Sequence, residues 1–155
     1  MASFRFRLDR VLDWRRTQLE IEEIKFKRET AALVEIDRRR AECEASGIQA
    51  EAQVRAWTPV TGRDVEALGS FRLRMKEEDA ALLLEREAQA KKAAAQGAAM
   101  LEARRRCRLL ERLKEQRAEE WRTEENRALE TAASETYLAQ WSRRGAAEGP
   151  RRASS

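Results

Sequence analysis

Hydrophobic residues recur at helical spacing along almost the whole chain. In the stretch before Trp57, four of them are spaced seven residues apart: Leu12, Leu19, Phe26 and Leu33. That spacing is typical of a helix that packs lengthwise on a second helix, because it keeps one apolar face toward the partner. No stretch shows sustained alternation of apolar and polar residues bounded by turns, so we expect no β-sheet.

One break interrupts the pattern, between residues 58 and 62. Pro59 lacks a backbone donor and disfavours the helical conformation of the residue before it. Thr61, with Asp64 three residues later, predicts the capped start of a new helix. We expect a short helix from Gly62 to Leu68, interrupted at Gly69 and Ser70 before the second long helix begins.

The second amphipathic stretch runs from Phe71 to Trp141 without a proline. Two long arms around one break predict an all-α fold, a long two-helix antiparallel coiled-coil hairpin formed within a single chain. The expected divisions are a first coiled-coil arm at 1–57, a turn with a short helix at 58–70, a second coiled-coil arm with a C-terminal overhang at 71–142, and a disordered basic tail at 143–155.

The expected register leaves one end of the second arm without a partner. If Trp57 lies opposite Ser70, then Phe6 meets Trp121, and the residues from 122 to 141 extend beyond the first arm. Leu138 and Trp141 are then exposed. Because an apolar seam of this kind usually marks an interaction site, we expect another molecule to cover it.

Charged residues make up 39% of the chain, aromatic residues 6%, and the net charge is +4. From residue 143 onward there are four Arg and one Glu, so most of that charge belongs to the tail. The Arg runs at 38–40 and 104–106 fit a solvated helix face better than a concentrated nucleic-acid-binding face, and we expect no nucleic acid partner. The longest apolar run, Ala80 to Leu84, is too short for a transmembrane helix, and no secretory signal is expected.

Catalytic chemistry is not expected. The chain has no His, and its Gly residues match no phosphate-binding loop. Cys43 and Cys107 fall on apolar seam positions far apart along the hairpin, so we expect no disulfide between them and expect each to be a small core residue. The sequence therefore predicts a protein that is not an enzyme and that carries no cofactor and no metal.

Two short motifs resemble the FliJ family of flagellar type III export chaperones. That family opens with an aromatic-x-Leu element, a Val-Leu pair and a Tyr-Arg-like pair, and near its other end it has a Leu-x-x-Leu element leading into Lys-x-x-Arg and an aromatic residue. The similar residues here are Phe6, Leu8, Val11, Leu12, Trp14 and Arg15, followed by Leu110, Leu113, Lys114, Arg117 and Trp121.

The resemblance implies a cytoplasmic component of the flagellar export apparatus, held at the inner face of the cell membrane through its partners. Proteins of this family resemble the central stalk of rotary ATPases. Their terminal end enters the ring of the export ATPase FliI, and they also contact the export gate protein FlhA. The residues predicted to bind a FliI-like ring are Phe6, Leu8, Leu12, Trp14, Arg15, Arg117, Trp121 and Trp141.

Three residues near the turn, Phe71, Met75 and Leu82, share one face of the second arm. If that face is exposed, it is the candidate surface for an FlhA-like gate; the alternative is that it packs on the first arm. Other functions also remain open at this point. They are a generic structural coiled-coil scaffold, a membrane-surface helical protein that uses its basic amphipathic start, and a helical nucleic-acid-binding arm.

Overall fold

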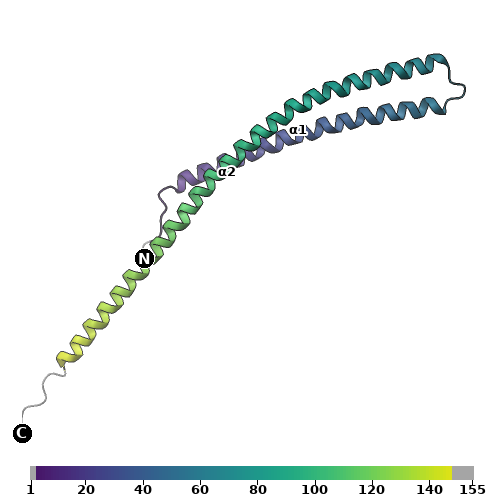
Figure 1. The fold of residues 1–155 in the computed structure, drawn as a ribbon. Coiled ribbons are helices and arrows are strands. Elements are labelled where there is room, and N and C mark those ends of the chain that lie inside the picture. The colour runs from purple at the N-terminus through teal and green to yellow at the C-terminus, as the bar shows by residue number, and fades with distance from the viewer. Residues whose placement is uncertain (1–2, 148–155) are drawn as a thin grey trace, which may run out of the picture. The chain divides into compact units, whose positions relative to one another are not determined.

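The computed structural model describes residues 3–147, which form two long helices joined by a short turn (Figure 1). Helix α1 comprises Asp9–Ala56, with 48 residues, and helix α2 comprises Gly62–Ala147, with 86 residues. The helices pack against each other in opposite directions, and no strand occurs in the part of the chain described. The predicted all-α antiparallel hairpin is therefore confirmed.

The chain divides into two compact units, which we describe separately. The larger unit is Asp13–Cys107 and contains most of α1, the turn and the first half of α2. The smaller unit combines the residues up to Leu12 with those from Arg108 onward. Among residues 3–147, no helix is long and apolar enough to cross a bilayer.

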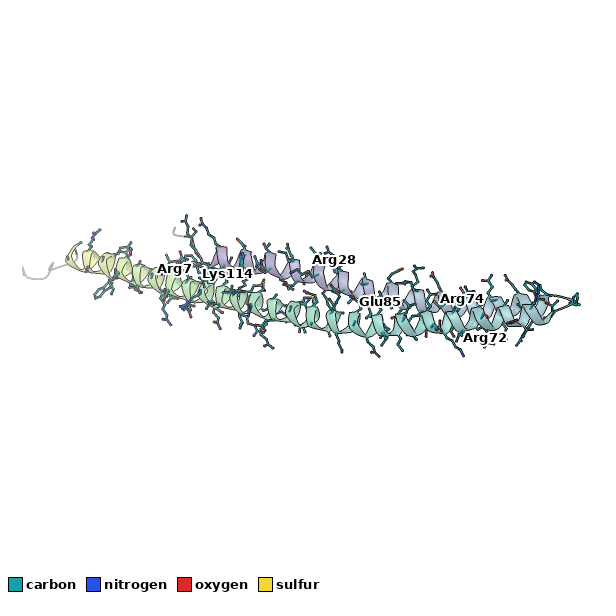
Figure 2. All side chains as sticks on the ribbon, turned by 90° about the horizontal axis from the view of Figure 1, so that it is seen from above. Arg7, Arg28, Arg72, Arg74, Glu85 and Lys114 are labelled. Carbon is teal, nitrogen blue, oxygen red and sulfur yellow. The ribbon has the colours of Figure 1, made fainter. Side chains whose placement is uncertain are left out.

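The larger unit is held by a thin apolar seam between its two helices. Ile36, Cys43 and Leu82 form a buried cluster, and Met75 packs against it. Both cysteines are buried, as predicted, and neither forms a disulfide bond. Charged side chains project from the outer faces of both helices (Figure 2). Because only one narrow face of each helix is covered, apolar burial is modest and the polar contacts beside the seam help to fix its register.

Near the turn, an ion pair between the helices lies about one helical turn away from the predicted register. Glu51 was expected opposite Lys76, but its carboxylate lies 4.0 Å from the guanidinium of Arg72. The cause is the turn, which is shorter than predicted. Helix α2 continues from Gly62 without the expected interruption at Gly69 and Ser70, so residues 62–70 belong to the second arm and not to a turn segment.

Two glutamine side chains cross the middle of the hairpin in the same way. The Nε2 atom of Gln89 donates to the backbone oxygen of Glu29 at 3.0 Å and also to its carboxylate. Gln96 makes the same pair of contacts with Glu22. The two pairs lie seven residues apart on both helices, which is the repeat of a coiled-coil seam. These hydrogen bonds help to align the Ala-rich part of α2 with α1, where little apolar surface is buried.

The start of α2 is capped as predicted. The Asp64 backbone N–H donates to the Thr61 hydroxyl at 3.3 Å, and the Thr61 backbone N–H donates to the Asp64 carboxylate at 2.8 Å. This reciprocal pairing satisfies donors that a helix N-terminus leaves without intrahelical partners. Hydrogen bonds from the Thr61 hydroxyl and backbone lower the pKa of Asp64.

In the smaller unit, the start of α1 and the end of α2 both differ from prediction. Residues 3–8 precede the first helix instead of forming part of it, since α1 begins at Asp9. Helix α2 continues to Ala147, so the prediction that disorder begins at residue 143 is wrong for 143–147. The rest of the predicted basic tail, 148–155, lies outside the described residues.

Candidate partner-binding surfaces

The N-terminal residues form a short strap on α2 in the smaller unit. We call residues 4–8 the strap; within it, Phe4 and Phe6 face α2 while Arg5 and Arg7 are exposed. Phe6 is only 8% exposed. The ring of Phe4 lies 6.1 Å from that of Trp121, centroid to centroid, at a tilt of 46°. Burial of Phe4 and Phe6 thus holds the strap against the helix, while the Arg residues that alternate with them stay exposed.

Two backbone hydrogen bonds and one ion pair lie at the junction between the strap and α1. The Asp9 backbone N–H donates to the Phe6 carbonyl oxygen at 3.2 Å, and the Leu12 N–H donates to that of Leu8 at 2.8 Å. The Asp9 carboxylate accepts a hydrogen bond from the Nζ of Lys114 at 2.7 Å; Lys114 is labelled in Figure 2. An acidic residue in the first turn also favours the start of a helix.

The strap and α2 enclose a groove of about 560 Å³. Its apolar lining comes from both sequence motifs: Phe6 and Leu8 from the first, and Leu113 and Trp121 from the second. Arg117 stands at the rim, 2.9 Å from Glu120. Residues more than 100 positions apart in the sequence therefore meet in one partly apolar, partly charged surface.

Beyond this groove, α2 continues without cover. Every residue from 126 to 147 is exposed. Tyr137, Leu138 and Trp141 are 68%, 60% and 69% exposed, values that are high for such large apolar side chains. Glu135 is the only charged residue between 131 and 142, in a chain that is 39% charged. This end of α2 (yellow in Figure 1) is the uncovered overhang predicted from the sequence.

Six of the eight residues predicted to bind the ATPase ring lie in the smaller unit. Phe6 and Leu12 are buried, so they can support a binding surface but offer little contact themselves. Trp121 is half-buried, whereas Leu8, Arg117 and Trp141 are exposed. Phe6 was predicted opposite Trp121; both line the groove, but the ring contact with Trp121 is made by Phe4.

The other two residues, Trp14 and Arg15, belong to the larger unit. The guanidinium of Arg15 stacks 4.7 Å from the centre of the Trp14 ring. Trp14 is 52% exposed and borders a small groove that also contacts Ala99 and Ala103 on α2. A half-exposed Trp held by an adjacent Arg is a common composition for a protein interface.

The residues predicted to contact an export gate do not form an exposed face. Leu82 is 2% exposed in the core cluster, and Met75 packs against that cluster. Phe71 is half-buried, and the guanidinium of Arg74 lies 5.9 Å from its ring. The alternative interpretation therefore holds for Leu82 and Met75, which pack on the first arm and stabilise the hairpin.

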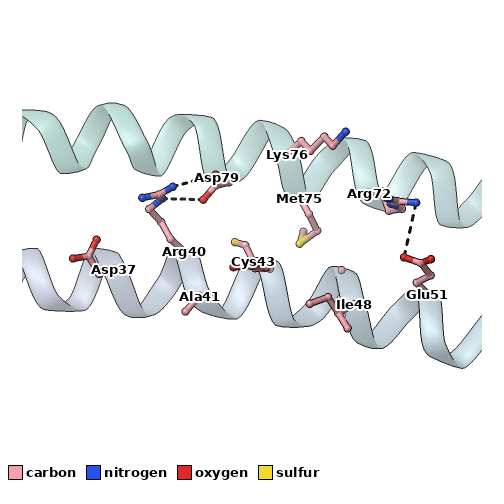
Figure 3. Close-up of a pocket in the computed structure, with 12 residues that line it drawn as sticks. Asp37, Arg40, Ala41, Cys43, Ile48, Glu51, Arg72, Met75, Lys76 and Asp79 are labelled. Atoms are coloured by element: carbon pink, nitrogen blue, oxygen red, sulfur yellow. Dashed lines mark hydrogen bonds and ion pairs between the residues drawn. The ribbon is translucent and has the colours of Figure 1, made fainter.

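A second groove in the larger unit was not predicted (Figure 3). Cys43 and Met75 line it, and Gly47 has no atom within 4 Å of where its Cβ would lie. Ion pairs stand on either side, Arg40 with Asp79 at 2.9 Å and Arg72 with Glu51 at 4.0 Å. In the sequence, only the small residue Gly47 at a seam position indicated that a groove could form here. Burial raises the pKa of the Cys43 thiol, which disfavours its reactive thiolate form.

Among residues 3–147, no cluster of three or more His, Cys, Asp or Glu side chains could hold a metal ion. Comparisons of the chain with protein-family models, with curated proteins and with solved structures find no match.

Proposed function

We propose that this chain is a non-enzymatic component of the flagellar type III protein export apparatus. In this proposal it acts as a central stalk whose terminal end binds the ring of a FliI-like export ATPase. It would also link that ring to an FlhA-like export gate, and would be held at the inner face of the cell membrane through these partners.

One observation carries the proposal: the two motifs that resemble the FliJ family meet in one groove. Phe6 and Leu8 come from the N-terminal motif, and Leu113, Arg117 and Trp121 come from the motif in α2. In an antiparallel hairpin the start of the chain and this part of α2 lie side by side, so both motifs can contribute side chains to one surface. Their convergence favours a single binding surface as the reason for both motifs.

The chemistry of the overhang agrees with insertion into a partner. Tyr137, Leu138 and Trp141 are largely exposed, and burying such residues supplies much of the energy of protein interfaces. Arg117, which lines the groove, can pair with carboxylates on a facing wall, for which the planar guanidinium is well suited.

The proposed link to the export gate needs a different surface from the one predicted. Since Leu82 is a core residue, its replacement would disturb the hairpin itself. Phe71 remains a candidate because it is half-buried and lies beside the exposed side chains of Arg72 and Arg74. We therefore restrict the gate proposal to the edge of α2 around Phe71.

Binding to a purified FliI-like ATPase tests the proposal. Trp141→Ala should weaken binding by about tenfold or more, as truncation of a large interface residue commonly does. The matched control is Val34→Ala, which removes a side chain that is 67% exposed on α1 in the other unit, and it should bind as the unmodified chain does. Equal affinity of the Trp141→Ala and Val34→Ala variants would contradict the proposal.

A further inference from the structure

The last five turns of α2 carry an exposed face with an unusual internal symmetry. Glu130, Ala133, Tyr137, Trp141 and Arg144 follow one another at spacings of three and four, so they lie on one side of the helix. All five are exposed. None of their side chains has an ion pair or hydrogen bond with any residue that the structure describes.

Tyr137 is the centre of that symmetry. Ala133 and Trp141 lie four residues before and after it, and Glu130 and Arg144 lie seven residues before and after it. If two copies of this helix cross in opposite directions at Tyr137, each Trp141 faces the small Ala133 of the other copy. Each Glu130 likewise faces Arg144 of the other copy. The same face is thus complementary to itself in both size and charge.

We propose that residues 130–144 form an antiparallel dimer interface with a second copy of this chain, with the two-fold axis near Tyr137. An interface of this symmetry uses the same patch on both copies, so every favourable pair occurs twice. A second copy would therefore cover Tyr137 and Trp141, and it would place an opposite charge beside Glu130 and beside Arg144. This inference does not rest on the proposed role in export. Both use Tyr137 and Trp141, so the dimer and the complex with an ATPase ring exclude each other.

The remaining residues of the segment agree with this pairing. Leu129 and Gly145 lie eight residues on either side of Tyr137, so again a large side chain would face a small residue. The other charged residues nearby, Glu135 and Arg143, fall on the opposite side of the helix from Tyr137. They stay in water in the dimer, where they cost no desolvation energy.

Sedimentation equilibrium of the full chain over a concentration series tests for self-association. The average mass should rise from 17.9 kDa toward twice that value as concentration increases. Trp141→Ala should shift the series toward the monomer. A chain that keeps the monomer mass into the millimolar range would overturn the proposal, as would a dimer that Trp141→Ala leaves unchanged.

Charge reversal tests the antiparallel pairing itself. Glu130→Arg or Arg144→Glu alone places like charges together at both ends of the interface, and each should weaken the dimer by about tenfold. An equimolar mixture of the two variants should restore association, because every contact in the mixed dimer again joins opposite charges. The controls Glu135→Arg and Arg143→Glu make the same charge changes on the opposite side and should leave association unchanged.

Two results would contradict the pairing. One is a mixture of the Glu130→Arg and Arg144→Glu variants that associates no better than either variant alone. The other is an equal loss of association in the Glu135→Arg and Arg143→Glu controls, which would reveal a response to net charge only. All four positions are exposed, so circular dichroism should report unchanged helicity, and a loss of association will not reflect unfolding.

Discussion

The ring of Phe26 lies against the backbone of Gly97, and its Cε2 atom is 3.0 Å from the position that a Cβ on residue 97 would occupy. Gly47, on the facing helix, has open space at its Cβ position. Both glycines lie inside long helices, where Gly is less favourable than Ala by about 0.5–1 kcal/mol. The two positions differ mainly in whether a side chain fits.

We predict that Gly47→Ala stabilises the hairpin by about 0.5–1 kcal/mol, through helix propensity alone. Gly97→Ala should gain less, because Phe26 must move to admit the methyl group, and Gly97→Leu should destabilise by about 1–3 kcal/mol through overpacking. Urea unfolding followed by circular dichroism measures all three. Equal gains from the two Ala variants would mean that Phe26 does not restrict residue 97.

The cap of α2 gives a second prediction. Thr61→Ala removes the hydroxyl that accepts from the Asp64 backbone N–H and donates to the Asp64 carboxylate. Loss of a Thr cap typically costs about 1 kcal/mol, and we expect that loss in urea unfolding. Thr58→Ala is the matched control, because Thr58 lies in the same turn and precedes the cap. A Thr58→Ala variant that loses as much stability would show that the cap is not the cause.

A third prediction concerns Asp37 and Arg86, which join the two helices. The guanidinium of Arg86 donates to both carboxylate oxygens of Asp37, at 2.6 and 3.3 Å, and this hydrogen bonding lowers the pKa of Asp37. A carboxyl group whose pKa is lower in the folded state stabilises that state fully above its ordinary pKa of about 3.9. The contribution is lost as pH falls through the lower, folded pKa.

A double-mutant cycle with Asp37→Asn and Arg86→Gln measures this coupling. Urea unfolding at pH 7 should give a favourable interaction between the two side chains, and the same cycle near pH 2 should give a smaller one. High salt should also reduce it, since both side chains are partly exposed. A coupling that is equal at both pH values would contradict an ionic origin.

Much of the fold could be predicted from spacing. The seven-residue repeat from Leu12 to Leu33 and the single break at Pro59 are enough to predict two helices in a hairpin. The cap at Thr61 follows from local chemistry. The interruption at Gly69 was wrong because one Gly costs a helix only about 1 kcal/mol, which a long packed helix easily offsets.

The register could not be predicted in the same way. It depends on turn length and on pairs such as Gln96 with Glu22, which join residues 74 positions apart. Their seven-residue repeat is visible in the sequence only when the partner helix is already known. Of the candidate surfaces, the exposed overhang at Trp141 could be predicted from the unequal lengths of the two arms. The strap could not, because it depends on Phe4 and Phe6 packing on α2 in place of a helix before Asp9.

Stimulation of a purified FliI-like ATPase is the most direct test of the proposed stalk function. A chain truncated after Arg122 keeps α1, the turn, the strap and Trp121, so circular dichroism should show a folded helical hairpin. It lacks the exposed residues up to Trp141 and should fail to stimulate ATP hydrolysis, whereas the full chain stimulates it. If the truncated, folded chain stimulates the ATPase as strongly as the full chain, the overhang is not the ring-binding element and the account is contradicted.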